Sequence, residues 1–408
     1  METWQRNLWL LWFGVLVTSA SFSMVVPFLP LFLLNIGVNQ HTELWSGLLY
    51  SITFLTGALV SPYWGSLADK YGRKPMILRA GFSLCVLYIL TSLVSNPYEL
   101  LVLRALQGAL AGYVPGAIAL VATNTPEARV GYALALMSTG NAVGGILGPL
   151  LGGGIARWWG NRVAFASAGV LVLFATLLVL FFVTEEKFVP SKTRSSVIEA
   201  LRLAAANRAF LMTLGLTVLT TFSIMTIEPV LPLYIAQLGG SLQDASLLAG
   251  IVFSLAGVAS VLFAPRWGRW ADRAGFQKVL LIGLIGGGIG NLAQIPFHDI
   301  WGFSIVRFLY GAFFCAVFPA LNGLVVSTTE PEFRGRAFGL NQTANQVGNM
   351  VGPMVGGAIG GAFGPHSVFL VTGLLLLVTS GVAFWSNRWV PRGKRPVQNP
   401  SVTSGTAT

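Results

Sequence analysis

The amino-acid sequence predicts an all-α membrane protein with twelve transmembrane helices in two repeated six-helix bundles. Three observations support this fold class: a scarcity of charge, a series of long apolar blocks and an internal duplication. Of the 408 residues, 54% are hydrophobic and only 10% are charged. A soluble domain carries about 25% charged residues. A chain with this composition therefore cannot cover its surface for contact with water alone.

The apolar residues form twelve blocks, and most of them reach about 20 residues, the length that crosses a hydrocarbon layer about 30 Å thick. Backbone polar groups in lipid must find partners within their own segment, so each block is predicted to be a helix. The predicted helices cover residues 8–34, 45–67, 76–94, 100–122, 131–156 and 163–183, then 209–236, 245–267, 278–297, 300–327, 335–363 and 367–389.

The two halves of the chain repeat one another. Matching residues recur at a nearly constant separation of 202 to 204 positions: Pro27 with Pro229, Asp69 with Asp272, Arg104 with Arg307, and Gly148 with Gly352. The repeat predicts six-helix bundles over residues 1–184 and 209–390. Between them, 185–208 is a polar linker in which 197–204 fits either a short interfacial helix or a loop, and the tail 391–408 is predicted to be disordered. Two similar bundles can rock about a site near the bilayer midplane.

Positive charges are distributed unevenly along the chain, whose net charge is +11. Of the 25 Lys and Arg residues, 21 fall in or beside the N-terminus, the even-numbered loops or the C-terminus. Arg157 and Arg162 fall in odd-numbered loops, and Arg104 and Arg307 lie well inside predicted helices. This bias follows the positive-inside rule and places both termini in the cytoplasm, in a bacterial inner membrane or a plasma membrane. It also argues against a basic patch that binds nucleic acid.

A loop between the second and third predicted helices, residues 65–74, carries the most specific motif in the chain. Its sequence, GSLADKYGRK, resembles the signature loop of the major facilitator superfamily. The resemblance implies a latch that shuts the cytoplasmic side, with the loop acid facing the start of the eleventh helix near 335–337. The implied gating residues are Gly65, Asp69, Gly72 and Arg73. The alternative is a turn that only its charge holds inside. In the second copy, Phe276 stands where the arginine is expected.

Arg104 and Glu228 are the candidates for proton coupling. Arg104 belongs to the segment LRALQG, which resembles the arginine-bearing motif of the same superfamily, and the resemblance links it to coupling. The alternative is a structural cation bonded to polar neighbours. Of the 14 acids, Glu228 is the only one inside a predicted helix, and its repeat partner is Val26. Loss of water favours the protonated form of a carboxyl group. Glu228 is therefore a candidate proton carrier, with a structural acid as the alternative.

Glycines recur every four residues in the fifth predicted helix, from Gly140 to Gly152. Such spacing gives a smooth face for close helix packing. The segment 144–153 resembles the antiporter motif of drug/proton exporters in the superfamily. The resemblance implies export rather than uptake, and it implies a gating role for Gly144, Gly148 and Pro149. Ordinary packing is the alternative, because packing sets no direction of transport.

Candidate substrate-binding residues are aromatic, methionine and asparagine side chains on the first, fifth, seventh, tenth and eleventh helices. Aromatic and methionine side chains adapt to varied apolar ligands. The candidates are Phe22, Met24, Met137, Asn141, Phe222, Met225, Tyr310, Phe314, Asn341 and Asn345.

Together these features predict a secondary active transporter that resembles the twelve-helix drug/proton antiporters, a family of multidrug resistance exporters. It is expected to act as a monomer in the lipid bilayer and to export amphipathic small molecules in exchange for protons. A proton-coupled uptake symporter of the same fold and a non-transporting membrane sensor are the alternatives. Cys85 and Cys315 lie one in each half and suggest neither a disulfide nor a metal site. No cofactor is expected, and no nucleophile–base pair or phosphate loop indicates an enzyme.

Overall fold

A computed structural model describes residues 2–185, 202, 206–239, 242–330 and 333–386 of the chain, and every regular element in these ranges is a helix. The predicted tail and most of the predicted linker, including the choice between helix and loop at 197–204, lie outside the described residues. The first helices are α1 (Thr3–Met24), α2 (Leu29–Asn35), α3 (Thr42–Tyr71), α4 (Arg73–Leu93), α5 (Pro97–Ala109), α6 (Tyr113–Asn124), the short η1 (Glu127–Arg129), α7 (Val130–Trp159) and α8 (Asn161–Phe182).

The later helices follow the same order of long and broken elements. They are α10 (Arg208–Met225), α11 (Leu231–Gly239), α12 (Leu242–Ala274), α13 (Phe276–Leu292), α14 (Ile300–Phe314), α15 (Val317–Thr328), α16 (Arg334–Phe363) and α17 (Pro365–Ser386). Ten stretches of the described chain are long and apolar enough to cross a membrane, and α13 is a shorter apolar helix of 17 residues. The predicted all-α, multi-pass membrane class is therefore confirmed.

Four predicted helices are interrupted, which corrects the expectation of continuous spans. The interruptions separate α1 from α2, α5 from α6, α10 from α11, and α14 from α15. Proline cannot donate a helical hydrogen bond, and its ring clashes with the carbonyl group four residues earlier. Pro30, Pro115, Pro232 and Pro319 place that clash at positions 26, 111, 228 and 315, each inside an interruption.

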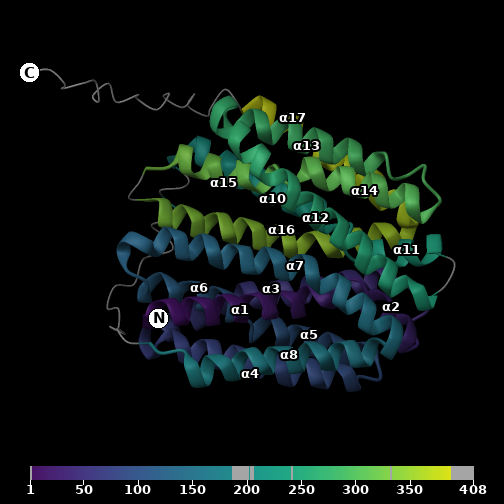
Figure 1. The fold of residues 1–408 in the computed structure, drawn as a ribbon. Coiled ribbons are helices and arrows are strands. Elements are labelled where there is room, and N and C mark those ends of the chain that lie inside the picture. Colours follow the sequence, from purple (N-terminus) through teal and green to yellow (C-terminus); the bar gives the residue numbers. More distant parts are fainter. Residues whose placement is uncertain (1, 186–201, 203–205, 240–241, 331–332, 387–408) are drawn as a thin grey trace, which may run out of the picture.

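The helices pack as two groups. In Figure 1, α1 to α8 fill the lower half of the molecule and α10 to α17 fill the upper half. In the first group α1 packs on α7 and α8, α4 on α8, and α3 on α5. In the second group α10 packs on α16, α13 on α17, and α12 on α14. The most extensive contacts between the groups join α3 to α16 and α7 to α12, and these four helices run along the centre of the view.

In the described part of the chain, backbone atoms of the two groups meet closely at one end of the molecule. At this closed end, a Cβ atom added to Gly47 would collide with the carbonyl oxygen of Pro353, and one added to Gly250 would collide with that of Pro149. At the opposite, open end, a Cβ atom at Gly335 would meet no heavy atom within 4 Å. Small residues thus let the backbones of the two groups touch at the closed end.

Candidate substrate cavity and coupling residues

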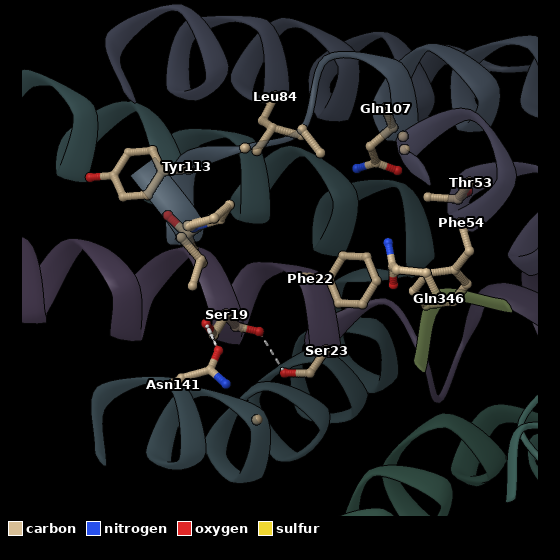
Figure 2. A pocket seen from close by; sticks show the side chains of 18 of the residues that line it. Ser19, Phe22, Ser23, Thr53, Phe54, Leu84, Gln107, Tyr113, Asn141 and Gln346 are labelled. Atoms are coloured by element: carbon tan, nitrogen blue, oxygen red, sulfur yellow. Dashed lines mark hydrogen bonds between the residues drawn. The ribbon is translucent and has the colours of Figure 1, made fainter. Parts of the chain in front are cut away.

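A cavity of about 370 Å³ lies within the first group of helices. Its wall is built from α1, α3, α4, α5, α6 and α7, and among the residues that line it only Gln346 of α16 belongs to the second group. The rings of Phe22 and Phe54 meet edge to face with centroids 6.3 Å apart on this wall, and Figure 2 shows them beside Gln346. The predominantly apolar wall with a few polar groups fits an amphipathic small molecule.

Polar side chains on α1 and α7 line another part of the same wall. The hydroxyl group of Ser19 donates to Oδ1 of Asn141 at 2.7 Å, as the dashed line in Figure 2 marks. Ser23 donates to the carbonyl oxygen of Gly144 at 3.1 Å and so joins the same two helices. The polar part of this wall is thus held in place by bonds between the helices.

A smaller void of about 10 Å³ adjoins the cavity and leads to Arg104. Phe22, Thr53 and Phe54 line both spaces, while Tyr50 and Arg104 line only the smaller one. A void of this size holds about one water molecule. The rings of Phe22 and Phe54 therefore stand between the cavity and the guanidinium group.

Arg104 is held against α3 by close packing of α5. A Cβ atom at Gly108 would collide with the carbonyl oxygen of Thr53, whose hydroxyl group donates to the carbonyl oxygen of Arg104 at 3.2 Å. The arginine is 6% exposed, and its Nη1 donates to Oε1 of Gln107 at 2.8 Å. Within the described residues, its Nε and Nη2 have no hydrogen-bond partner.

Glu228 lies in the turn between α10 and α11, half-buried at the junction of the two groups. Its carboxylate interacts electrostatically with Arg307 and Tyr310 of α14 and with Tyr50 of α3. In the described part of the chain no hydrogen bond or ion pair engages it. In the first group, the equivalent turn is stabilised differently, because the hydroxyl group of Tyr50 donates to the carbonyl oxygen of Val26 at 3.1 Å.

The predicted substrate residues are distributed over several parts of the structure. Phe22 and Asn141 line the cavity. Met24 and Met137 are buried in the packed core of the first group, and Tyr310 and Phe314 stack with centroids 5.3 Å apart in the core of the second. Asn341 and Asn345 accept hydrogen bonds of 2.8 Å from Thr217 and Thr221, and the helix that carries Phe222 and Met225 packs against the glycines of α16.

Sequence reasoning missed most of the cavity wall. Phe54, Gln107 and Tyr113 line the cavity, and neither composition nor the duplication singles them out. A signal was available for Gln107, because it follows Arg104 by three positions and so lies on the same helical face. The contribution of Gln346 depends on how the two groups meet, which no local pattern encodes.

The segment 65–74, predicted to be a loop, is almost wholly helical, which corrects that expectation: residues 65–71 are the last turns of α3, Gly72 separates the two helices, and Arg73 begins α4. Asp69 is exposed and has no described hydrogen bond or ion pair. The backbone N–H groups of Arg73 and Lys74 instead donate to the two carboxylate oxygens of Glu185, each at 2.9 Å. The side chain of Arg73 donates to the carbonyl oxygen of Ala119 at 2.6 Å. These bonds hold the segment to other parts of the first group of helices.

Gly72 separates α3 from α4 with φ +98°, a conformation that favours glycine. The latch role of Gly65, Asp69, Gly72 and Arg73 stays a prediction.

The glycines that recur every four residues in α7, from Gly140 to Gly152, form a stripe that packs against α1. The close packing predicted for this stripe is confirmed. Cβ atoms at Gly144, Gly148 and Gly152 would collide with α1, at the carbonyl oxygens of Leu16, Ala20 and Met24 respectively. The copy in α16 packs in the same way on α10. Pro149 lies inside an α7 helix that continues from Val130 to Trp159. The gating role of these residues stays a prediction.

Comparison with known proteins agrees with this architecture. The family model for the Major Facilitator Superfamily matches residues 11–257 and 214–406. The chain is 40% identical over 382 residues to the multidrug resistance proteins MdtG of Salmonella paratyphi B and Salmonella typhimurium, covering 92% of this chain and 93% of each relative. The resemblance to multidrug resistance exporters predicted from the sequence is confirmed.

Solved structures of transporters share the fold at low sequence identity. A bacterial homologue of the human lysosomal transporter Spinster, in an inward-facing and unoccupied conformation, superposes with a TM-score of 0.80 at 14% identity, covering 96% of this chain and 98% of that one. The nucleoside transporter NupG superposes with a TM-score of 0.76 at 13% identity, covering 95% and 100%. At these identities the likeness concerns the fold alone.

Proposed function

Because this chain belongs to the major facilitator superfamily, we propose that it exports amphipathic small molecules in exchange for protons by alternating access. The observation that carries this proposal is the cavity of about 370 Å³ between helices of the first group, with Gln346 of the second group on its wall. A site that both groups line can change its access when the groups rock. The relatives named multidrug resistance proteins support export as the direction.

The proposal assigns twelve transmembrane helices to two six-helix bundles, residues 1–184 and 209–390, joined by a cytoplasmic linker. Each interrupted pair, such as α5 with α6, then counts as one span, and α13 and α16 complete the set. The open end, which holds Asp69 and Gly335, faces the cytoplasm of a bacterial inner or plasma membrane, as the distribution of positive charge favours. This conformation would be inward-facing, ready to take a substrate from the cytoplasm.

Glu228 is proposed as the proton carrier. It lies in a helix interruption at the junction of the groups, near Arg307 and Tyr50, and has no described hydrogen-bond partner. A carboxylate in this setting changes its charge on protonation without losing a fixed structural bond, which suits a carrier. Arg104 is proposed to couple the protonation state to the cavity through Tyr50, which lies beside both side chains.

Transport by the purified full chain in liposomes tests the function. We expect liposomes with an acidic lumen to accumulate amphipathic probes, for which ethidium, N-phenyl-1-naphthylamine and 1-naphthaleneacetate offer a cation, a neutral molecule and an anion. Accumulation of a probe only when the exterior is acidic would replace antiport with uptake symport. Binding of probes without movement in either gradient would identify a sensor.

A further inference from the structure

Near its C-terminal end, α12 carries three arginines and a tryptophan on one face. They are spaced by three, one and three residues, which places them side by side on the surface of a helix. Each of the arginines is exposed, and Trp270 is 39% exposed. Together the four side chains line a hollow of about 200 Å³, and none of them lines the cavity of the first group. They are Arg266, Arg269, Trp270 and Arg273.

The position of this face along α12 corresponds to the edge of a membrane. Asp244 forms its ion pair near the start of the helix, and the 21 residues from Ala245 to Pro265 carry no charge. At about 1.5 Å per residue this uncharged stretch is about 30 Å long, which matches the hydrocarbon layer. Arg266 is the first charge beyond it. The arginines therefore lie at the level of the lipid head groups, where tryptophan side chains also gather.

The same side of α12 is apolar and uncovered within the uncharged stretch. Val258 and Leu262 are 43% and 52% exposed, and Arg266 follows them at the spacing of four residues that keeps side chains on one face. Other sides of the helix bond to protein, because Ser254 donates to a carbonyl oxygen of α7 and Trp267 to one of α14. One lipid molecule can thus contact the apolar residues with its acyl chains and the arginines with its head group.

The three guanidinium groups have few partners in the protein. Nη1 of Arg266 and Nε of Arg269 donate to carbonyl oxygens of their own helix, at 2.7 and 3.4 Å. In the described part of the chain Arg273 has no hydrogen bond, and neither Asp272 nor any other carboxylate pairs with the three. Each guanidinium group has five N–H donors. Most of these donors are therefore available to an anion from outside the protein.

The first group lacks this arrangement. The repeat positions, 203 residues earlier, hold Tyr63, Ser66, Leu67 and Lys70, with a single positive charge. The positive-inside rule favours basic residues near the ends of helices, but it does not require them on one face. The clustering of three arginines beside a tryptophan is therefore better explained by an anion that binds there.

We propose that this face of α12 binds an anionic phospholipid, such as phosphatidylglycerol, in the leaflet at the open end of the molecule. The lipid phosphate would accept paired hydrogen bonds from the guanidinium groups. Its acyl chains would follow Val258 and Leu262, and Trp270 would lie beside the glycerol region. Basic pockets at the cytoplasmic ends of transmembrane helices suit such head groups. The inference depends neither on the direction of transport nor on its coupling to protons.

Lipid binding to the full chain, purified in detergent and depleted of native lipid, tests the proposal. Native mass spectrometry would compare 1-palmitoyl-2-oleoyl-phosphatidylglycerol with the phosphatidylcholine that has the same acyl chains. The first phosphatidylglycerol should bind at least about twentyfold more tightly, because each arginine near an anionic head group contributes about fivefold. Inorganic phosphate and glycerol phosphate should not displace it at equal concentration, since neither has acyl chains. Displacement by either would show a site for free anions and overturn the lipid assignment.

Two double variants with the same loss of charge locate the site. Arg269→Gln combined with Arg273→Gln should reduce the preference for phosphatidylglycerol to at most about fivefold, the contribution of the one remaining arginine. Arg6→Gln combined with Arg129→Gln is the control, because it removes two exposed arginines of the first group. This control should keep the preference of the parent chain.

A photoactivatable phosphatidylglycerol, with its reactive group in an acyl chain, provides a second measurement on the unmodified chain. Cross-links mapped by peptide mass spectrometry should fall within 258–274 and should disappear with excess phosphatidylglycerol. This measurement decides the question if the variant of Arg269 and Arg273 does not fold. Equal binding of the two lipids, an equal loss of preference in both double variants, or cross-links confined to other helices would overturn the proposal.

Discussion

Nε of Arg157 lies 2.5 Å from Oδ1 of Asp244, and this ion pair ties the end of α7 to the start of α12 at the closed end. The pair crosses from one helix group to the other. Arg162, the other arginine that breaks the positive-inside pattern, donates to the carbonyl oxygens of Ser92 and Val94. Each of the two arginines outside the positive-inside pattern, Arg157 and Arg162, thus has a structural role.

Breaking the ion pair should shift the equilibrium away from the conformation described here. Both side chains are partly exposed, 32% and 45%, so the pair contributes about 0.2–1 kcal/mol and its loss should change the populations by about 1.4- to fivefold. In Arg157→Gln, two spin labels at positions 66 and 339 of the open end should show a larger fraction of short label-to-label distances, measured by pulsed electron paramagnetic resonance. The charge-reversed double variant of Arg157 and Asp244 should restore the original distribution, and no restoration would argue against a direct pair.

Glu228→Gln should leave the protein folded and end proton-driven accumulation. The amide keeps the size of the side chain but cannot exchange a proton, whereas one charge that crosses 100 mV is worth about 2.3 kcal/mol, or tens-fold accumulation. Accumulation in acidic-lumen liposomes should fall to the level found without a gradient, at an unchanged melting temperature. Glu127→Gln alters an exposed acid outside the long helices and should behave like the parent chain. Undiminished accumulation by the Glu228 variant would remove it as the carrier.

Gly148→Ala should destabilise the first group. Its new methyl group would collide with the hydroxyl oxygen of Ser23 and the carbonyl oxygen of Ala20, and overpacking of this kind costs about 1–3 kcal/mol. The melting temperature in detergent should fall accordingly. Gly145→Ala on the same helix is the control, because its methyl group meets no heavy atom within 4 Å. Equal melting temperatures for both variants would contradict the packing described for this stripe.

Glu185 and Asp69 should respond differently to neutralisation. Glu185→Gln weakens the carboxylate that receives the first N–H groups of α4 and should lower stability by about 0.5–2 kcal/mol, measured by thermal unfolding. Asp69→Asn should leave stability unchanged, since Asp69 is exposed and has no described partner. If the loop is a latch in the other conformation, Asp69→Asn should still slow transport. A normal transport rate in that variant would support the alternative of a simple turn.

The interrupted helices show why a correct helix assignment still missed part of the structure. Every interruption has a proline four residues after its central carbonyl, so the cause lies in the sequence. Whether a proline bends a helix or ends it depends on what else can bond the freed carbonyl. Pro149 and Pro353 lie inside continuous helices. At position 26, by contrast, Tyr50 from another helix supplies the donor.

The sequence by itself determined the membrane class, the duplication, the family and the close packing of the glycine stripes, because these follow from hydrophobic length, repeated spacing and residue size. Only the tertiary structure decided which side chains surround the cavity, that Arg104 keeps unbonded donors beside the smaller void, and that Arg157 finds Asp244. These facts depend on contacts between residues far apart in the chain, such as the 87 positions between Arg157 and Asp244. They are set by how whole helices pack rather than by any local pattern.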